Sequence, residues 1–291
     1  MYPSRFEYEA PRSVEEAIAL LAAGQGEAKV LAGGQSLVPM MKLRFANPAM
    51  LVDINRLPGL GYHRIEADGT IRIGALCRHA HLEHSADIAR SQPTMTAAAP
   101  LIADPIVRNR GTLVGSLCHA DPQGDWAAVA MALDGHVIAQ GPRGRRSIPV
   151  REFVSGPFQN TLAYDELAVE AVLPGPKGAV RGGFLKLERR VGDFATAGAA
   201  VALELVGARV SRAGIALTGV GSATVDASDA AAALVGAELD AATIARAAEL
   251  AAAVAKPNSD HRGSADYKRH VVHTFVTRIL TRIADAEERA A

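Results

Sequence analysis

The first stretch whose residue types could do chemistry is a double glycine between two apolar runs, Lys29-Val30-Leu31-Ala32-Gly33-Gly34-Gln35-Ser36-Leu37. Val30 and Leu31 suit a short buried strand, whereas Gly33 and Gly34 accept backbone angles that other residues resist. Ser36 adds a hydroxyl beside backbone N–H groups that the turn leaves free. Such a turn forms a concave nest of donors that suits a phosphate or diphosphate. A tight strand-to-helix turn without a ligand is the alternative interpretation.

A second stretch with the same ingredients covers residues 103–122. It has glycines at a turn and hydroxyls at Thr112 and Ser116, and it is too polar for a core element but too apolar for a disordered loop. A helix is predicted to follow over 123–133, with Asp125 in its first turn, where the helix dipole favours an acid. Asp125 could bind a ligand hydroxyl or serve only as an N-terminal helix charge.

A third stretch, residues 188–196, combines several charges with Phe194 among small residues. The charges are compatible with a solvated hairpin. Phe194 is instead a large flat side chain at a bend, where the ring of a cofactor could rest.

Histidines and cysteines give little support to a metal centre. His79, His81 and His84 do not share one helix face, so they predict a solvated helix start rather than a metal site. Cys77 and Cys118 are far apart and have no CxxC spacing, so one chain cannot build an iron–sulfur cluster or a zinc site from them. They suit two reduced cysteines of a cytoplasmic protein.

The composition predicts a globular protein. The chain has 291 residues, a length that suits two domains or one large layered domain. Of these residues 49% are hydrophobic and 21% charged, which is enough apolar material for a buried core. Equal numbers of basic and acidic residues, 31 each, argue against a nucleic-acid binder and suit a surface partly covered by another protein. Neither a signal pattern at the N-terminus nor an apolar run of roughly 20 residues is present, which favours a cytoplasmic location.

The periodicity predicts two small units followed by a different domain. Residues 1–57 read as an α/β unit with a helix that Ser13 and Glu16 cap, and 58–176 as a unit with strands at 61–66, 70–76, 136–140, 146–150 and 166–173. Residues 153–160 read as a loop. A linker at 175–178 separates 1–176 from 177–291, which reads as three antiparallel strands (183–187, 196–205, 209–220) followed by alanine-rich helices at 227–235, 241–255 and 265–286.

Neither glycine region matches the Rossmann GxGxxG or the Walker A loop. Two nests in consecutive α/β units can instead hold one extended diphosphate between them, as a dinucleotide requires, because a buried diphosphate needs many donors.

Three motifs occur in order: Ala32-Gly33-Gly34-Gln35-Ser36-Leu37, Arg110-Gly111-Thr112-Leu113-Val114-Gly115-Ser116 with His119-Ala120-Asp121-Pro122, and Arg189-Arg190-Val191-Gly192-Asp193-Phe194-Ala195-Thr196. With them the chain, from Phe6 to about Ile283, resembles the FAD-binding medium subunit of the molybdenum hydroxylases, the group of carbon monoxide dehydrogenase and xanthine dehydrogenase. The resemblance implies an α+β fold: two subdomains of the vanillyl-alcohol-oxidase type clasp FAD, and an antiparallel-sheet plus helix-bundle domain follows.

The resemblance also implies roles for individual residues. The two glycine loops would contact the diphosphate, His119 would lie beside them, and Asp125 would hold the ribose or adenosine side. Leu167 would line the adenine pocket, Lys186 would lie at the pyrimidine edge of the flavin and favour an anionic reduced ring, and Ile102 and Phe194 would flank the ring. The implied contacts are Ala32, Gly33, Gly34, Gln35, Ser36, Leu37, Ile102, Gly111, Thr112, Val114, Gly115, Ser116, His119, Asp125, Leu167, Lys186 and Phe194.

Two positions depart from the family pattern. Val114 replaces the first of two paired glycines, and because valine disfavours a positive φ, either this position is extended or the diphosphate lies slightly farther away. Phe194 stands where some relatives carry tyrosine, so stacking is kept and the hydroxyl is lost.

The function that the resemblance implies is electron transfer within a larger enzyme. A large partner would oxidise the substrate at molybdenum, a small partner would carry [2Fe–2S] clusters, and FAD in this chain would pass electrons to an external acceptor, within a dimer of heterotrimers, a heterohexamer. A stand-alone FAD-dependent oxidase or dehydrogenase of related fold is the alternative. It would need a general base, and His119 and Asp121 are the best of several weak candidates for that role. A non-catalytic scaffold that has lost its cofactor is a third possible function.

Overall fold

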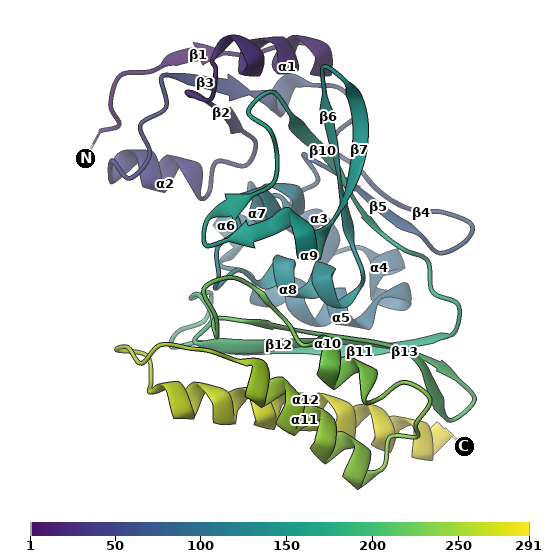
Figure 1. Cartoon of the computed structure of the whole chain (residues 1–291). Helices are drawn as coiled ribbons and strands as arrows, with labels where there is room; N and C mark the ends of the chain where they lie inside the picture. The colour runs from purple at the N-terminus through teal and green to yellow at the C-terminus, as the bar shows by residue number, and fades with distance from the viewer. Residues whose placement is uncertain (1, 291) are drawn as a thin grey trace.

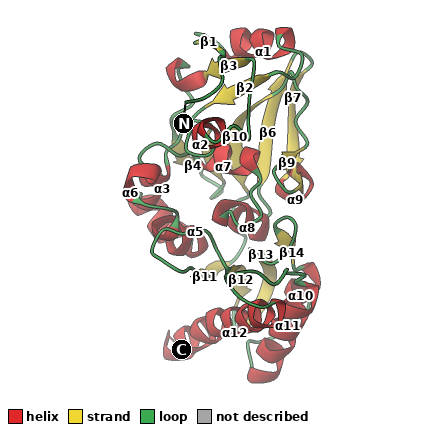
Figure 2. Cartoon of the chain, turned by 90° about the vertical axis from the view of Figure 1, so that its left-hand side faces the viewer, coloured by secondary structure: helices red, strands yellow, loops and turns green. Residues whose placement is uncertain are grey.

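The computed structural model describes residues 2–290, which form three regions stacked along one axis (Figure 1). A small sheet with two helices lies at one end, a larger sheet with short helices lies in the middle, and a third sheet with long helices lies at the other end. Figure 2 shows the same order from the side. None of the described helices combines the length and the apolarity that a membrane crossing requires.

The first region is a parallel three-stranded sheet in the order β1 (Glu7–Glu9), β3 (Met50–Asp53), β2 (Ala28–Leu31). Helix α1 (Val14–Ala23) is capped by Ser13, as predicted, because the Ser13 hydroxyl accepts from the N–H of Glu16 at 3.0 Å. Helix α2 (Leu37–Lys42) follows the double glycine. The strand β1 was not predicted from the sequence, because its three residues are exposed and show no apolar pattern.

The middle region contains a five-stranded antiparallel sheet in the order β4 (His63–Ile65), β5 (Ile71–Gly74), β10 (Leu167–Leu173), β6 (His136–Gly141), β7 (Gly144–Pro149). The predicted strands are all present. Residues 153–160 are not a loop, because they end a short helix α9 (Val150–Phe153) and form the hairpin β8 (Val154–Gly156) and β9 (Gln159–Asn160). Six more helices complete the region: α3 (His79–Glu83), α4 (Ala86–Ser91), α5 (Pro93–Ala98), α6 (Pro105–Arg108), α7 (Leu113–His119) and α8 (Asp125–Ala132).

The third region is an antiparallel sheet in sequence order, as predicted. Its strands are β11 (Ala179–Leu187), β12 (Ala197–Val206), β13 (Arg209–Thr218) and the short β14 (Val225–Asp226). The helices are α10 (Ser228–Ala232), α11 (Ala241–Val254) and α12 (Ala265–Ala290), and the last two cover one face of the sheet (Figure 1). Their small side chains allow close packing, since Ala247, Ala248 and Ala251 of α11 are fully buried.

The other face of this sheet is covered by α5 and α8 of the middle region (Figure 1). The Thr94 hydroxyl of α5 donates to the carbonyl oxygen of Val201 in β12 at 2.8 Å. Gly214 of β13 has no room for a side chain, because a Cβ there would lie 2.8 Å from the carbonyl carbon of Ala132. The middle and third regions therefore share a close-packed interface, and the start of α8 is held by both.

Candidate cofactor site

One large cavity, of about 710 Å³, lies between the first and middle regions. Both glycine loops contribute to its wall, the first at residues 32–37 and the second at 111–116. Further walls come from residues 102–104, from 158–168 and from the 192–194 segment that follows β11. The three motifs that were singled out in the sequence therefore meet at one cavity.

The two glycine loops touch each other at Gly33. A Cβ on Gly33 would overlap the carbonyl oxygen of Arg110 and lie 2.8 Å from the Cα of Gly111. The absence of a side chain at Gly33 therefore makes room for the second loop. Of the two adjacent glycines, only Gly34 has a positive φ, +75°. The pair thus meets two separate requirements, a close approach of two chains and a left-handed turn.

Two polar side chains that the sequence analysis missed tie the loops together. The Asn55 amide donates to the carbonyl oxygen of Ala32 at 2.7 Å and accepts from the Arg78 guanidinium at 2.6 Å. Arg78 also donates to the carbonyl oxygen of Arg110 at 2.6 Å. Asn55 lies two residues after the end of β3, and a polar residue near a strand end was the only available signal.

The first loop presents unpaired backbone donors to the cavity. Within residues 2–290, no hydrogen bond is formed by the N–H groups of Gly34, Gln35 or Ser36. Ser36 is the N-cap residue of α2, yet its hydroxyl makes no cap hydrogen bond. These N–H groups and the Ser36 hydroxyl can donate hydrogen bonds to a ligand anion without breaking any existing contact.

The second loop ends in the first turn of α7. The Thr112 hydroxyl accepts from the N–H of Gly115 at 3.1 Å and so caps the helix. Val114 is neither extended nor strained: it is the second residue of α7, and its side chain is buried in the core. The expectation that it is extended is wrong, because a helical backbone suits valine while the N–H of a second helical residue remains free.

His79 is not part of a solvated helix start, which corrects the sequence prediction for this residue. It is buried against Gly111, and its Nδ1 accepts from the indole N–H of Trp126 at 2.9 Å. Burial and the nearby Arg108 and Arg78 lower the pKa of His79 to about 4, so the ring is neutral at pH 7. Among residues 2–290 no cluster of three metal-ligating side chains is present.

Asp125 and Lys186 form a buried ion pair at 3.0 Å at one end of the cavity. The Lys186 ammonium also contacts Glu188 and the carbonyl oxygens of Leu101 and Asp193. Burial raises the pKa of Asp125 to about 6, although Lys186 opposes this shift. Lys186 is enclosed by these partners and does not line the cavity, and its predicted charge effect on a flavin ring stays a prediction.

The same contacts place Asp125 beside the segments that carry Ile102 and Phe194. Asp125 was predicted at the ribose or adenosine side, whereas Ile102 and Phe194 were predicted to flank the ring. All three line the cavity and lie close to one another, because Lys186 binds Asp125 and the carbonyl oxygens of Leu101 and Asp193 at one end of it. Which part of the cofactor each would meet stays a prediction. The Thr218 hydroxyl, which donates to the carbonyl oxygen of Gly124 at 3.0 Å, fixes the start of α8 at that end.

The segment that carries Phe194 is held from two sides. Gly192 lies against residue 103, where a Cβ would be 2.7 Å from the carbonyl oxygen of Ala103. Arg262, which the sequence analysis missed, donates to the carbonyl oxygen of Phe194 at 2.9 Å. The Phe194 ring is half exposed at the cavity.

Most of the predicted contact residues line the cavity, and two do not. Leu167 is buried in the core of β10, while its neighbours Glu166 and Ala168 line the cavity, because successive strand residues point to opposite sides. Lys186 is the second exception, for the reason given above. His119 lines the cavity and packs against Phe158 in a tilted arrangement, with ring centroids 5.2 Å apart.

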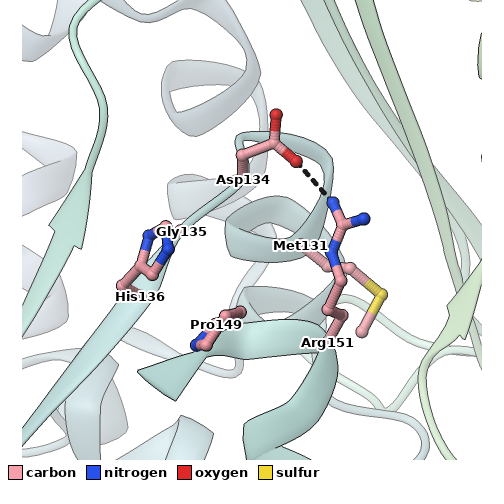
Figure 3. Close-up of a pocket in the computed structure, with 6 residues that line it drawn as sticks. All are labelled: Met131, Asp134, Gly135, His136, Pro149 and Arg151. Carbon is pink, nitrogen blue, oxygen red and sulfur yellow. Dashed lines mark hydrogen bonds and ion pairs between the residues drawn. The ribbon is translucent and has the colours of Figure 1, made fainter. Parts of the chain in front are cut away.

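A smaller pocket of about 280 Å³ lies at the end of α8 (Figure 3). Asp134 and Arg151 pair there at 2.5 Å, and Asp134 also binds Arg212 at 2.7 Å. The charges of this pocket are satisfied by one another, and none of the three sequence motifs contributes to it.

Two family models match the chain. Residues 4–176 match the FAD binding domain in molybdopterin dehydrogenase, and residues 183–283 match the CO dehydrogenase flavoprotein C-terminal domain. The chain belongs to this family of FAD-binding subunits. The family resemblance inferred from the three motifs is thereby confirmed.

Full-length relatives support the same assignment. The carbon monoxide dehydrogenase medium chain of Hydrogenophaga pseudoflava is 42% identical over 280 residues, which is 96% of this chain and 97% of the relative. The alpha subunit of the 6-hydroxypseudooxynicotine dehydrogenase complex of Paenarthrobacter nicotinovorans is 42% identical over 97% of this chain and 95% of its own length.

A solved structure of carbon monoxide dehydrogenase from Hydrogenophaga pseudoflava contains a chain with the same fold. It matches with a TM-score of 0.93 and 43% identity, over 99% of both chains. The predicted fold class is confirmed by this match. Members of the family are medium or FAD subunits of multi-subunit oxidoreductases, which favours the electron-transfer interpretation over a stand-alone oxidase.

Proposed function

We propose that this chain binds FAD in the large cavity and passes electrons from the iron–sulfur clusters of a partner subunit to an external acceptor. The observation that carries the proposal is that two loops with unpaired backbone donors meet at Gly33 and border one cavity. A dinucleotide with a central diphosphate needs such a double contact, because its charge must be paired when it leaves water.

The residues present fit FAD in two respects. The free N–H groups of Gly34, Gln35 and Ser36 and of the first turn of α7 supply donors for a diphosphate. Asp125 Oδ1 is buried at the cavity wall and has no hydrogen-bond partner among residues 2–290. An unpartnered carboxylate oxygen costs free energy unless a ligand hydroxyl donates to it, and the sugar-like chains of FAD carry such hydroxyls.

When bound, FAD supplies reversible one- and two-electron chemistry. The chain's own residues bind and orient it. The glycine loops would hold the diphosphate, Asp125 would accept from a hydroxyl, and Ile102 and Phe194 would flank the ring. Lys186 would hold the segments beside that ring, since it binds Asp125 and the carbonyl oxygens of Leu101 and Asp193. No acid–base pair is assigned, since electron transfer requires none.

The proposal includes an assembly. The partners are a large molybdenum-binding subunit and a small [2Fe–2S] subunit, in a dimer of heterotrimers located in the cytoplasm. The subunit names of the relatives support a multi-subunit enzyme, and the two free cysteines, Cys77 and Cys118, are compatible with a reducing compartment. We further propose a FAD-binding domain at 1–176, with subdomains of about 1–57 and 58–176, and a C-terminal domain at 177–291. The substrate is chosen by the large subunit.

The test is purification of the chain from flavin-replete cells, alone and with its genomic neighbours. We expect a yellow protein with one FAD per chain and co-purification with two other chains. Reduction of the flavin by substrate in the isolated chain would favour the stand-alone oxidase instead. A colourless preparation that takes up no FAD would contradict the proposal.

A further inference from the structure

His79 is a buried side chain of the cavity wall that no predicted contact accounts for. It begins α3, directly under the second glycine loop, and its backbone N–H donates to the carbonyl oxygen of Gly111 at 2.9 Å. A Cβ on Gly111 would lie 2.7 Å from both Nε2 and Cδ2 of the ring. Nε2 is therefore the nitrogen that faces the loop.

The protonation of the ring follows from its partner. The indole N–H of Trp126 can only donate, so His79 Nδ1 must accept, at 2.9 Å. Burial keeps the ring neutral, and the single proton then resides on Nε2. Trp126 is itself almost fully buried, which fixes the orientation of the ring.

The Nε2–H donor has no acceptor among residues 2–290. Most of the His79 side chain is buried, but Nε2 itself is not among the fully enclosed unpartnered atoms and so keeps access to the cavity. A donor that opens onto a cavity and is not used by the chain is free to pair with an acceptor atom of a ligand. His79 and Gly111 both line the cavity, so a ligand there can supply it.

We propose that His79 is a binding residue of this site, whose Nε2–H donates a hydrogen bond to an acceptor oxygen of the bound dinucleotide, and that Trp126 selects the required tautomer. This inference rests on the proposed function. A neutral donor pairs the ligand oxygen without adding a positive charge next to Arg78 and Arg108.

The test is NMR spectroscopy of the ¹⁵N-histidine-labelled full chain, flavin-free and then with FAD added. We expect the His79 signal to report protonated Nε2 before addition and its Nε2–H proton to move downfield with FAD. His136, in the separate pocket of Figure 3, serves as the internal control. An unmoved His79 signal while FAD binds would overturn the inference. Failure of the wild-type chain to bind FAD would instead contradict the proposed function.

Two variants separate donation from packing. His79→Phe keeps a ring but removes the donor, and we expect FAD affinity to fall about tenfold, as for one lost hydrogen bond to an ionised or strongly polar group. His79→Gln keeps an N–H at a similar reach and should recover part of the loss. Trp126→Phe should allow Nδ1 protonation, which the same NMR experiment detects. Equal losses in the Phe and Gln variants would indicate packing alone and overturn the inference.

Discussion

Gly33 and Gly111, from loops 78 residues apart in the chain, lie so close that a methyl group on Gly33 would be 2.8 Å from the Cα of Gly111. The contact brings two sets of unpaired backbone donors to one cavity. The Asn55 and Arg78 side chains link the two loops, since they bind the carbonyl oxygens of Ala32 and Arg110 and each other.

Gly33→Ala should separate the loops. We expect overpacking to cost about 1–3 kcal/mol in unfolding free energy and FAD affinity to fall by about tenfold or more. Gly61→Ala is the matched control, because nothing lies within 4 Å of a Cβ there. Denaturant unfolding and FAD titration measure both effects. Wild-type FAD affinity in Gly33→Ala would contradict the double-loop model.

Lys186→Met should destabilise the fold strongly. It leaves Asp125 and Glu188 without their buried cation, which costs about 3–5 kcal/mol in unfolding free energy. Arg246→Met removes one partner of an exposed ion pair with Glu249 and should change stability by less than about 0.5 kcal/mol. Equal stability of the two variants would show that the Lys186 network is dispensable.

Val114→Gly restores the residue usual in the family and tests whether valine impairs the site. We expect a loss of about 2–4 kcal/mol in unfolding free energy, because a buried side chain is removed from a helix. FAD affinity should stay within about twofold, since the backbone N–H is unchanged. Tighter FAD binding in the glycine variant would mean that Val114 does hold the diphosphate away.

Phe194→Ala should weaken flavin binding, and Phe194→Tyr should preserve it. Loss of an aromatic contact with the ring corresponds to about 0.5–1.5 kcal/mol, or roughly twofold to tenfold in affinity. Val191→Ala changes the same segment at an almost fully exposed side chain and is the control. Visible circular dichroism of the flavin band reports the ring environment. The same spectrum in Phe194→Ala and wild type would exclude contact.

His79 should make stability depend on pH. Its pKa is lowered to about 4 from 6.5, so the unfolded chain binds the proton more readily between these values. The stability that the neutral ring contributes is present above pH 6.5 and is lost as the pH falls towards 4, by about 3 kcal/mol in total. Asp125, with its pKa raised to about 6, acts in the opposite sense, since its contribution is lost as the pH rises from 3.8 to 6.

The measurement is the unfolding free energy of wild type and His79→Phe at pH 7, 6, 5 and 4. Asp125 is present in both proteins, so the difference between them isolates His79. We expect the wild type to lose more stability than the variant as the pH falls. Parallel curves would contradict the assignment of a buried neutral ring.

Local patterns were sufficient for much of the fold. Ser13 caps its helix because the cap needs only residues three positions apart. Strands β11, β12 and β13 and the long helix α12 were predicted at overlapping positions, with β12 apolar along most of its length, whereas the start of β11 and the short β14 were not. The short helices α4 and α5 were missed, since six residues carry little periodic signal, and Pro93 between them reads as a breaker although it begins α5.

It was easier to predict which residues line the cavity than to predict which of them contact one another. The sequence identified the glycine loops, Asp125 and Phe194, all of which line the cavity. The predicted positions of Asp125 and Lys186 relative to the ring stay predictions, but the ion pair between these two residues, 61 positions apart, was not foreseen from the sequence. Arg262 was missed since it lies 68 positions from Phe194 in the chain.

By itself, the sequence determined which short segments turn, which carry free donors and to which family they belong, because these properties depend on residues close together in the chain. Only the tertiary structure decided that Gly33 makes room for a second loop, that His79 is buried against Trp126 and that two carboxylates enclose Lys186. Burial and charge pairing are set by neighbours that folding brings from distant positions, and spacing along the chain does not encode them.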